Sequence, residues 1–331
     1  MTKHRQKGVT LVELMVSLII GLVLTGAVIQ VYLSNSITFR LQEGMSKVQE
    51  SGRLALQYMA RELREAGTGL EFSIGATPTA CMVDKDTCDG YLVSGLFGEI
   101  APSSGDAIPG SDIVTIGGTD SCDAQLDGVY KPNSANFKAS KFCDSMKKGS
   151  VLMLVDFKQA VIFSVNNSPS AGGNITINHS GPANVVSNKL GGVVFDDGAR
   201  VMGFSNQSYL VRNTGLTDAA GFPIRALAVR NNLATNPSAS IVDLVDGVED
   251  MRAFYGVPNG AELDYKRANE ITAADQWAEV RAVRLELLLV SDTSALGTES
   301  QSIDFGGNAV PSDGRFREVY STVAAIRNRV N

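Results

Sequence analysis

A long apolar segment near the N-terminus, with one carboxylate at its start, constrains this chain most. Between Leu14 and Leu33 only four residues are polar: Ser17, Thr25, Gln30 and Tyr32. About 20 helical residues at about 1.5 Å each match the roughly 30 Å hydrocarbon core of a bilayer. Glu13 stands at the head of this segment, where a carboxylate costs about 2.5–3.5 kcal/mol. The segment predicts a membrane-spanning helix, with Glu13 as a functional residue.

The residues in front of this segment are basic and end in a small residue. Lys3, Arg5 and Lys7 precede Gly8. A secretory signal peptide places its small-residue cleavage site after the apolar run, whereas Gly8 comes before it. The positive-inside rule assigns the three cations to the cytoplasmic side, so the rest of the chain is expected to be exported. A plain signal anchor with an incidental Glu13 is the alternative.

The junction Lys7-Gly8-Val9-Thr10-Leu11-Val12-Glu13-Leu14 resembles the class III leader of type IV pilins and related pseudopilins. Val9 stands where that family usually has Phe. The resemblance implies that a prepilin peptidase cleaves between Gly8 and Val9 and methylates the new amine of Val9. It also implies that Glu13 pairs with the amine of a neighbouring subunit during assembly, although pairing with Val9 of the same chain is an alternative.

The apolar period changes after Leu33 to the three-and-four spacing of one helical face. That face comprises Ile37, Leu41, Met45, Val48, Gly52, Ala55, Leu56, Met59 and Leu63. No proline interrupts residues 9–66, so one helix of about 85–90 Å is expected, with Gly67 as its cap. Two separate helices are the alternative, because glycines interrupt the segment. We expect a leader at 1–8, a transmembrane half at 9–33 and an amphipathic half at 34–66.

From Gly69 onward the sequence pattern is typical of β-strands. Short apolar or β-branched runs predict strands at 113–116, 151–155, 160–163, 209–211 and 283–290. Segments 100–112, 164–182 and 231–240 are predicted to be loops, and Pro258-Asn259-Gly260 a turn. Residues 272–280 are predicted to form a short helix capped by Thr272. The predicted fold class is α+β: a long N-terminal transmembrane helix packed on a β-rich globular head, residues 67–331, with an antiparallel sheet.

Sequence blocks in the C-terminal third indicate which kind of pilin the chain resembles. Residues 242–252 lead into Tyr255-Gly256-Val257, and residues 313–322 precede 325–329. Together with the leader, these blocks resemble the PilW family of minor type IV pilins. A J-type pseudopilin of a type II secretion system shares the leader and helix and is the nearest alternative. A stand-alone membrane-anchored adhesin is a further one.

Charge and cysteine content agree with an exported head. Without Lys3, Arg5 and Lys7, 26 of the 29 basic residues remain against 35 acidic ones, a net charge of −9. So acidic a head is not expected to bind nucleic acid specifically. Its four cysteines predict two disulfides in an oxidising compartment, in one of three connectivities. The most local pairing is Cys81–Cys88 with Cys122–Cys143.

Catalytic chemistry is poorly represented. The two histidines are His4, in the leader, and His179, and neither a nucleophile elbow nor a phosphate-binding loop is present. The pair Asp196-Asp197 precedes Gly198 and is predicted to be a solvated turn. One weak calcium candidate is the set Asp84, Asp86 and Asp89, whose spacing departs from the calcium-loop pattern. We expect no enzyme activity and no cofactor.

The resemblance implies a structural subunit that helps to initiate pilus assembly with other minor pilins, with a place at the pilus tip. Motility, adhesion and DNA uptake would follow from that role. The implied partners are the prepilin peptidase, other minor pilins, the major pilin and inner-membrane lipid. Before assembly the chain would cross the inner membrane once, with its N-terminus cytoplasmic and its head periplasmic. After assembly it would lie in the pilus at the cell surface.

Overall fold

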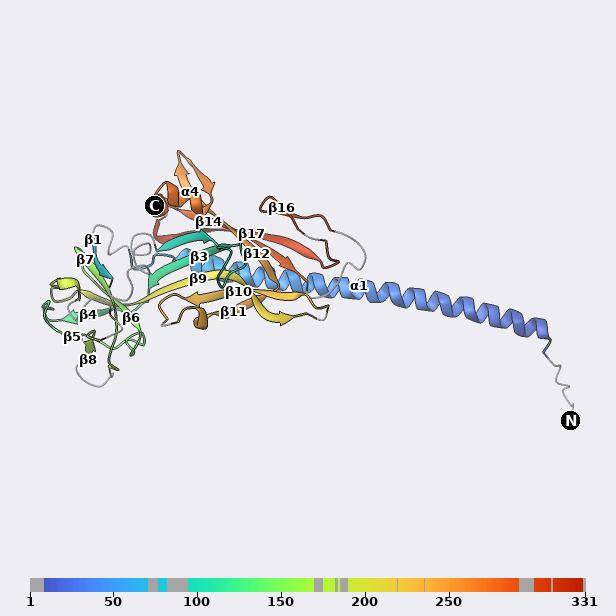
Figure 1. The fold of residues 1–331 in the computed structure, drawn as a ribbon, viewed down its shortest axis with the longest axis horizontal. Helices are drawn as coiled ribbons and strands as arrows, with labels where there is room; N and C mark the ends of the chain where they lie inside the picture. Colours follow the sequence, from blue (N-terminus) through green and yellow to red (C-terminus); the bar gives the residue numbers. More distant parts are fainter. Residues whose placement is uncertain are drawn as a thin grey trace.

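A long helix runs along the molecule and enters a head built of β-strands (Figure 1). The computed structural model describes residues 9–70, 77–81, 95–169, 175–181, 184, 190–218, 220–234, 236–291, 301–310 and 312–329. Helix α1 (Leu11–Glu65) is continuous over 55 residues, which confirms one helix rather than two. Thr10 caps its start, and Gly67, with φ of 75°, follows its end in the left-handed region.

The described strands are mostly antiparallel and form three sheets. The large sheet contains β1 (Thr77–Cys81), β2 (Leu96–Ile100), β3 (Asp112–Thr119), β4 (Ala124–Asp127), β5 (Asn136–Ala139), β6 (Val151–Val155), β7 (Gln159–Ser164), β8 (Ile175–Asn178), β9 (Arg200–Thr217), β10 (Pro223–Asn231) and β11 (Val242–Asp246). A four-stranded sheet has the order β13 (Glu262–Lys266), β12 (Val248–Asn259), β14 (Ala282–Val290) and β17 (Arg317–Ala325). β15 (Asp304–Phe305) and β16 (Asn308–Ala309) form a small hairpin. Only the β1–β7 pair is parallel among the described strands.

Short helices complete the described elements. They are the 3-10 turns η2 (Leu190–Gly192), η3 (Ser238–Ser240), η4 (Trp277–Glu279) and η5 (Arg327–Arg329), and the helix α4 (Ala268–Ala273). The predicted helix at 272–280 was wrong: α4 begins earlier and a 3-10 turn follows it. Thr272 lies near the end of α4, where its hydroxyl donates to the carbonyl of Ala268 at 2.9 Å. The helix start is set instead by Glu270, whose carboxylate accepts from the backbone N–H of Arg267 at 2.8 Å.

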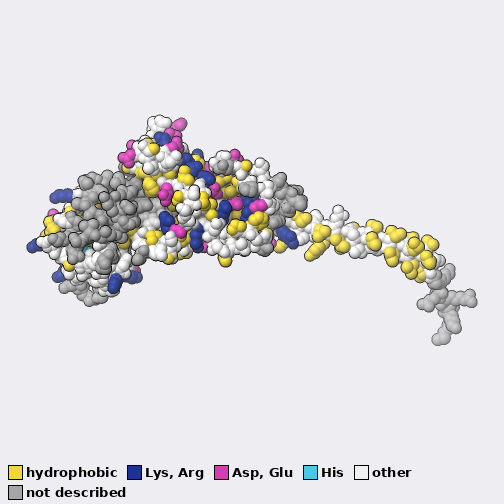
Figure 2. All heavy atoms as spheres, in the orientation of Figure 1, with side chains coloured by type: hydrophobic (Ala, Val, Ile, Leu, Met, Phe, Trp, Pro, Cys, Tyr) yellow, Lys and Arg dark blue, Asp and Glu magenta, His cyan; other side chains and the backbone are white. Residues whose placement is uncertain are grey.

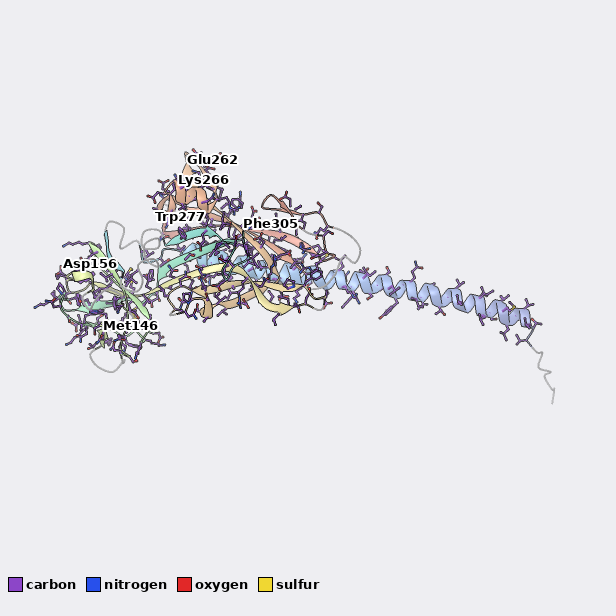
Figure 3. The ribbon with its side chains drawn as sticks, viewed as in Figure 1. Met146, Asp156, Glu262, Lys266, Trp277 and Phe305 are labelled. Carbon is purple, nitrogen blue, oxygen red and sulfur yellow. A yellow bond between two sulfur atoms is a disulfide. The ribbon has the colours of Figure 1, made fainter. Side chains whose placement is uncertain are left out.

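Strand β9 joins the two main parts of the head. Its first residues pair with β4 and β6, and its later residues pair with β3 and β10. We call the part built of β1, β4–β8 and the start of β9 the distal lobe, because it lies farthest from the N-terminus (Figure 1). We call the remainder, which packs on α1, the proximal lobe. Figure 3 marks Met146 and Asp156 in the distal lobe.

The proximal core lies between α1, the four-stranded sheet and the proximal strands of the large sheet. Period-two alternation directs four residues of β14 into this core: Val283, Leu285, Leu287 and Leu289. Five residues of the predicted helix face are buried against it: Val48, Gly52, Ala55, Met59 and Leu63. Ile37 is 56% exposed, so the buried stripe begins later than the predicted face. The first buried residue of α1 is Gly44.

The distal lobe has its own core. The side chains of β6 and β7 are buried on both faces: Leu152 and Leu154 face the distal core, whereas Val151, Met153 and Val155 face a smaller cluster with Leu70. All five predicted strands are present. The predicted loop at 164–182 was wrong in part, because it contains β8, which pairs with β5. The turn at Pro258-Asn259-Gly260 is confirmed as the β12–β13 hairpin.

Candidate functional site: the exposed half of helix α1

The part of α1 between Leu11 and Arg40 stands almost wholly free of the head. Figure 2 shows apolar side chains along it on the visible face. It belongs to the one described helix that is long and apolar enough to cross a membrane, with a mean hydropathy of 2.4 in that helix's most apolar window. Exposure of so many apolar side chains to water would be costly, so this half is built for lipid or for other helices.

Three hydroxyl side chains within this half bond to carbonyl groups of the helix itself. The hydroxyl of Ser17 donates to the carbonyl of Glu13 at 2.7 Å, and that of Thr25 to the carbonyl of Gly21 at 2.7 Å. Thr38 bonds Ser34 in the same way at 3.0 Å. These bonds let three hydroxyls enter an apolar environment without an external partner.

Glu13 forms the N-terminal cap of α1. Its Oε2 accepts from the backbone N–H of Thr10 at 3.1 Å and from the Thr10 hydroxyl at 3.1 Å. The Thr10 hydroxyl accepts in turn from the backbone N–H of Glu13 at 3.2 Å, completing a capping box. The second carboxylate oxygen, Oε1, has no hydrogen-bond partner within the described part of the chain. The side chain of Glu13 therefore has a local structural role and a free acceptor that can meet a cation.

The remaining predicted site residues divide into described and undescribed ones. Gly8 lies outside the described residues, and Val9 is 73% exposed just before the cap. Cys122 and Cys143 form a disulfide, as predicted. The Cys81–Cys88 pair lies outside the described side chains, as do Asp84, Asp86 and Asp89. Among the described residues, no group of three or more His, Cys, Asp and Glu side chains could hold a metal.

Two polar residues noted in the sequence, Asp197 and His179, have structural roles. Asp197 lies in an exposed turn, where its carboxylate accepts from the backbone N–H of Gly128 at 2.7 Å. His179 is buried among the rings of Tyr130, Phe137 and Phe163. Its burial lowers the pKa of the imidazole to about 4, so His179 is neutral at pH 7.

A buried ion cluster was missed by the sequence reasoning, although its residues lie in blocks that carried the resemblance. The Arg317 guanidinium donates to Glu249 at 2.5 and 3.1 Å and to Asp313 at 2.7 and 2.8 Å. Arg315 donates to Asp313 at 2.9 and 2.7 Å. Burial would raise the pKa of Asp313, but hydrogen bonds from Arg317 and Arg315 outweigh it and hold that pKa well below its usual range. The cluster joins the starts of β12 and β17.

A free apolar helix with a capped carboxylate at its start, followed by a disulfide-bonded β head, defines a membrane-anchored pilin-type subunit. Comparison with known families agrees. Residues 3–29 match the prokaryotic N-terminal methylation motif, and residues 208–328 match the family described as Type IV Pilus-assembly protein W. No curated protein and no solved structure matches significantly. The two family matches support a PilW-type minor pilin, and they point to a structural rather than an enzymatic protein.

Proposed function

We propose that this chain is a minor type IV pilin that helps to initiate pilus assembly together with other minor pilins and that takes a place at the pilus tip. The observation that carries the proposal is the free apolar half of α1 with Glu13 in its first turn. The match of residues 208–328 to the PilW family supports the minor-pilin role. Motility, adhesion and DNA uptake would all follow from assembly.

The proposed cycle begins in the inner membrane. Prepilin peptidase cleaves between Gly8 and Val9 and methylates the Val9 amine, a step that the methylation-motif match supports. The N-terminus lies on the cytoplasmic side, the head in the periplasm, and lipid surrounds residues 14–33. The major pilin and other minor pilins then replace that lipid around α1 as the subunit enters the filament.

Glu13 is the proposed contact for assembly. Cleavage creates a cationic amine on Val9, and an unpaired charge costs several kcal/mol in an apolar layer. Oε2 of Glu13 is already held by Thr10, whereas Oε1 has no partner among the described residues. The N-terminal amine of a neighbouring subunit can bind Oε1 without breaking the Thr10–Glu13 cap. Such pairing would also set the axial position of one subunit against the next.

Recovery of partners from membranes tests this proposal. The full-length protein, solubilised in detergent, is captured and its co-purifying proteins are identified by mass spectrometry. Other minor pilins and the major pilin are expected. Recovery of secretion-system pseudopilins instead would assign the chain to the J-type pseudopilins. Recovery of neither class would contradict a role in pilin assembly.

A further inference from the structure

Strand β17 forms one edge of the four-stranded sheet. Among the described strands it pairs with β14 alone, over nine residues from Arg317 opposite Val290 to Ala325 opposite Ala282. Two of its side chains remain exposed although they are apolar: Val319 is 40% exposed and Val323 is 51% exposed. An exposed edge strand is a template for pairing with another chain, and soluble proteins usually block such edges.

The side chain of Gln301 shows which backbone groups face this free edge. Its carboxamide accepts from the N–H of Arg317 at 2.8 Å and donates to the carbonyl of Arg317 at 2.7 Å. These two groups of Arg317 therefore point away from β14. Because alternate residues of a strand point their N–H and C=O groups the same way, those of Val319, Ser321 and Val323 also face the free edge.

Gln301 thus occupies the first position that an added strand would use, and no described strand pairs at the next three positions. Within the described part of the chain, no hydrogen bond is made by the outward backbone groups of Val319, Ser321 or Val323. One amide side chain mimics one residue of a neighbouring strand, but no described residue continues the pairing along β17.

A groove lies beside the open edge, between β17 and the flank of α1. Its volume is about 770 Å³, and Tyr320 and Thr322 line it from the strand side. Leu56 and Ala60 line it from α1, with Arg53, Arg64 and Glu50 beside them. A strand added at about 4.8 Å from β17 would direct alternate side chains toward this groove.

We propose that an extended strand of another pilin subunit adds to the free edge of β17, an inference that rests on the proposed function in pilin assembly. Backbone bonds at Val319, Ser321 and Val323 would supply the pairing, and side chains in the groove the selectivity. Positions of the partner strand that face α1 should be small or apolar, to meet Leu56 and Ala60. A carboxylate beside them would meet Arg53 or Arg64.

The direction of β17 argues against antiparallel pairing of two copies of this chain through this edge. Gly52 of α1 lies against Tyr320, and the carbonyl of Gly67 accepts from the side chain of Asn328 at 2.9 Å. Rising residue numbers therefore follow the same direction in α1 and β17, as Figure 1 also shows. Antiparallel pairing of two β17 strands would point the two α1 helices in opposite directions. Both helices could not then enter the same membrane from one side.

A proline at an outward position of β17 tests the backbone contact to the partner without disturbing the fold of the head. In the Ser321→Pro variant the outward N–H is lost, whereas the ladder to β14 is kept, and edge strands tolerate proline at such positions. The Ser321→Ala variant keeps the N–H and serves as the matched control. Each full-length variant is captured from membranes, and partner pilins are quantified. Thermal unfolding of both variants establishes that the head is folded.

We expect Ser321→Pro to lower the recovery of one partner pilin about tenfold, because one or two backbone hydrogen bonds to the added strand are lost. Ser321→Ala should recover partners as the unmodified protein does. Unchanged recovery with a folded Ser321→Pro variant would overturn the proposal while leaving the assembly function intact. Absence of all pilins from the unmodified sample would contradict the assembly function itself.

A photo-crosslinking residue at Val323, in an otherwise unmodified chain, gives a second test that does not depend on proline. The expected product is a crosslink to an extended segment of a different pilin, identified by peptide mass spectrometry. Crosslinks only to a second copy of this chain, or only to lipid, would overturn the proposal.

Discussion

The ring of Tyr320 on β17 packs directly on Gly52 of α1. A Cβ atom at position 52 would lie 2.8 Å from Cδ2 and 2.9 Å from Cγ of that ring. The Tyr320 hydroxyl also donates to Glu318 at 2.6 Å, which holds the ring in place. Glycine at this position lets the helix and the edge strand approach closely.

The variant Gly52→Ala should therefore destabilise the head. Alanine improves helix propensity by about 0.5–1 kcal/mol. Overpacking of its Cβ against the Tyr320 ring, near the Cγ atom, costs about 1–3 kcal/mol. We expect a net loss, measured as a lower thermal unfolding temperature of the detergent-solubilised protein. The double variant Gly52→Ala/Tyr320→Ala removes the clash. Equal losses from Gly52→Ala in the presence and absence of Tyr320 would contradict this packing account.

The buried His179 predicts a pH dependence of stability. The unfolded chain takes up a proton near pH 6.5, whereas burial holds the folded pKa at about 4. As pH falls from 6.5 toward 4 the unfolded state binds more protons, so the free energy of unfolding should decrease by up to about 3 kcal/mol. Unfolding measured at pH 7 and pH 5 checks this. His179→Phe should abolish most of the difference, and an unchanged difference would refute the assignment to His179.

The Cys122–Cys143 disulfide should stabilise the distal lobe. It links residues 21 apart, and Cys122 belongs to the distal core. The variant Cys122→Ser/Cys143→Ser should lose about 2–4 kcal/mol of unfolding free energy, while its proximal lobe keeps its α1 contacts. Non-reducing peptide mapping checks the connectivity. The same map tests the predicted Cys81–Cys88 bridge, and any crossed pairing would disprove both.

Processing of the leader gives a prediction independent of the head. The variant Gly8→Leu should keep residues 1–8, because a bulky residue no longer fits the peptidase, and it should be absent from filaments. Intact mass spectrometry of the membrane-extracted protein measures the outcome. A species that begins at Met1 in the unmodified protein would show that the Gly8–Val9 junction is not cleaved.

The sequence predicted those parts of the fold that depend on local pattern. The 3.6-residue spacing of Val48, Gly52 and Ala55 identified the buried face of α1, and the apolar run at 151–155 identified β6. Strand β8 was missed because it forms by pairing with β5 and by burying Ile175 and Ile177 in the distal core, contacts between distant segments.

The same limit applied to the sites. The Thr10–Glu13 capping box is a local motif, and Glu13 was found from its position in the sequence. In the cluster of Glu249, Asp313 and Arg317, Glu249 and Arg317 are 68 residues apart in the sequence. No local spacing in the sequence indicates that these side chains meet. The free edge of β17 is likewise a consequence of sheet order, which a single strand's sequence does not contain.

The central claim is that the charge of Glu13 recruits other pilins, and two substitutions at this position test it. Glu13→Val removes both the charge and the cap to Thr10, and Glu13→Gln removes the charge but keeps an acceptor for the cap. Both should insert and be cleaved normally, because each makes the segment less polar. The measurement is the amount of partner pilin co-purified from membranes with each full-length variant. We predict that both variants lose most of their partners; recovery equal to that of the unmodified protein would contradict the claim.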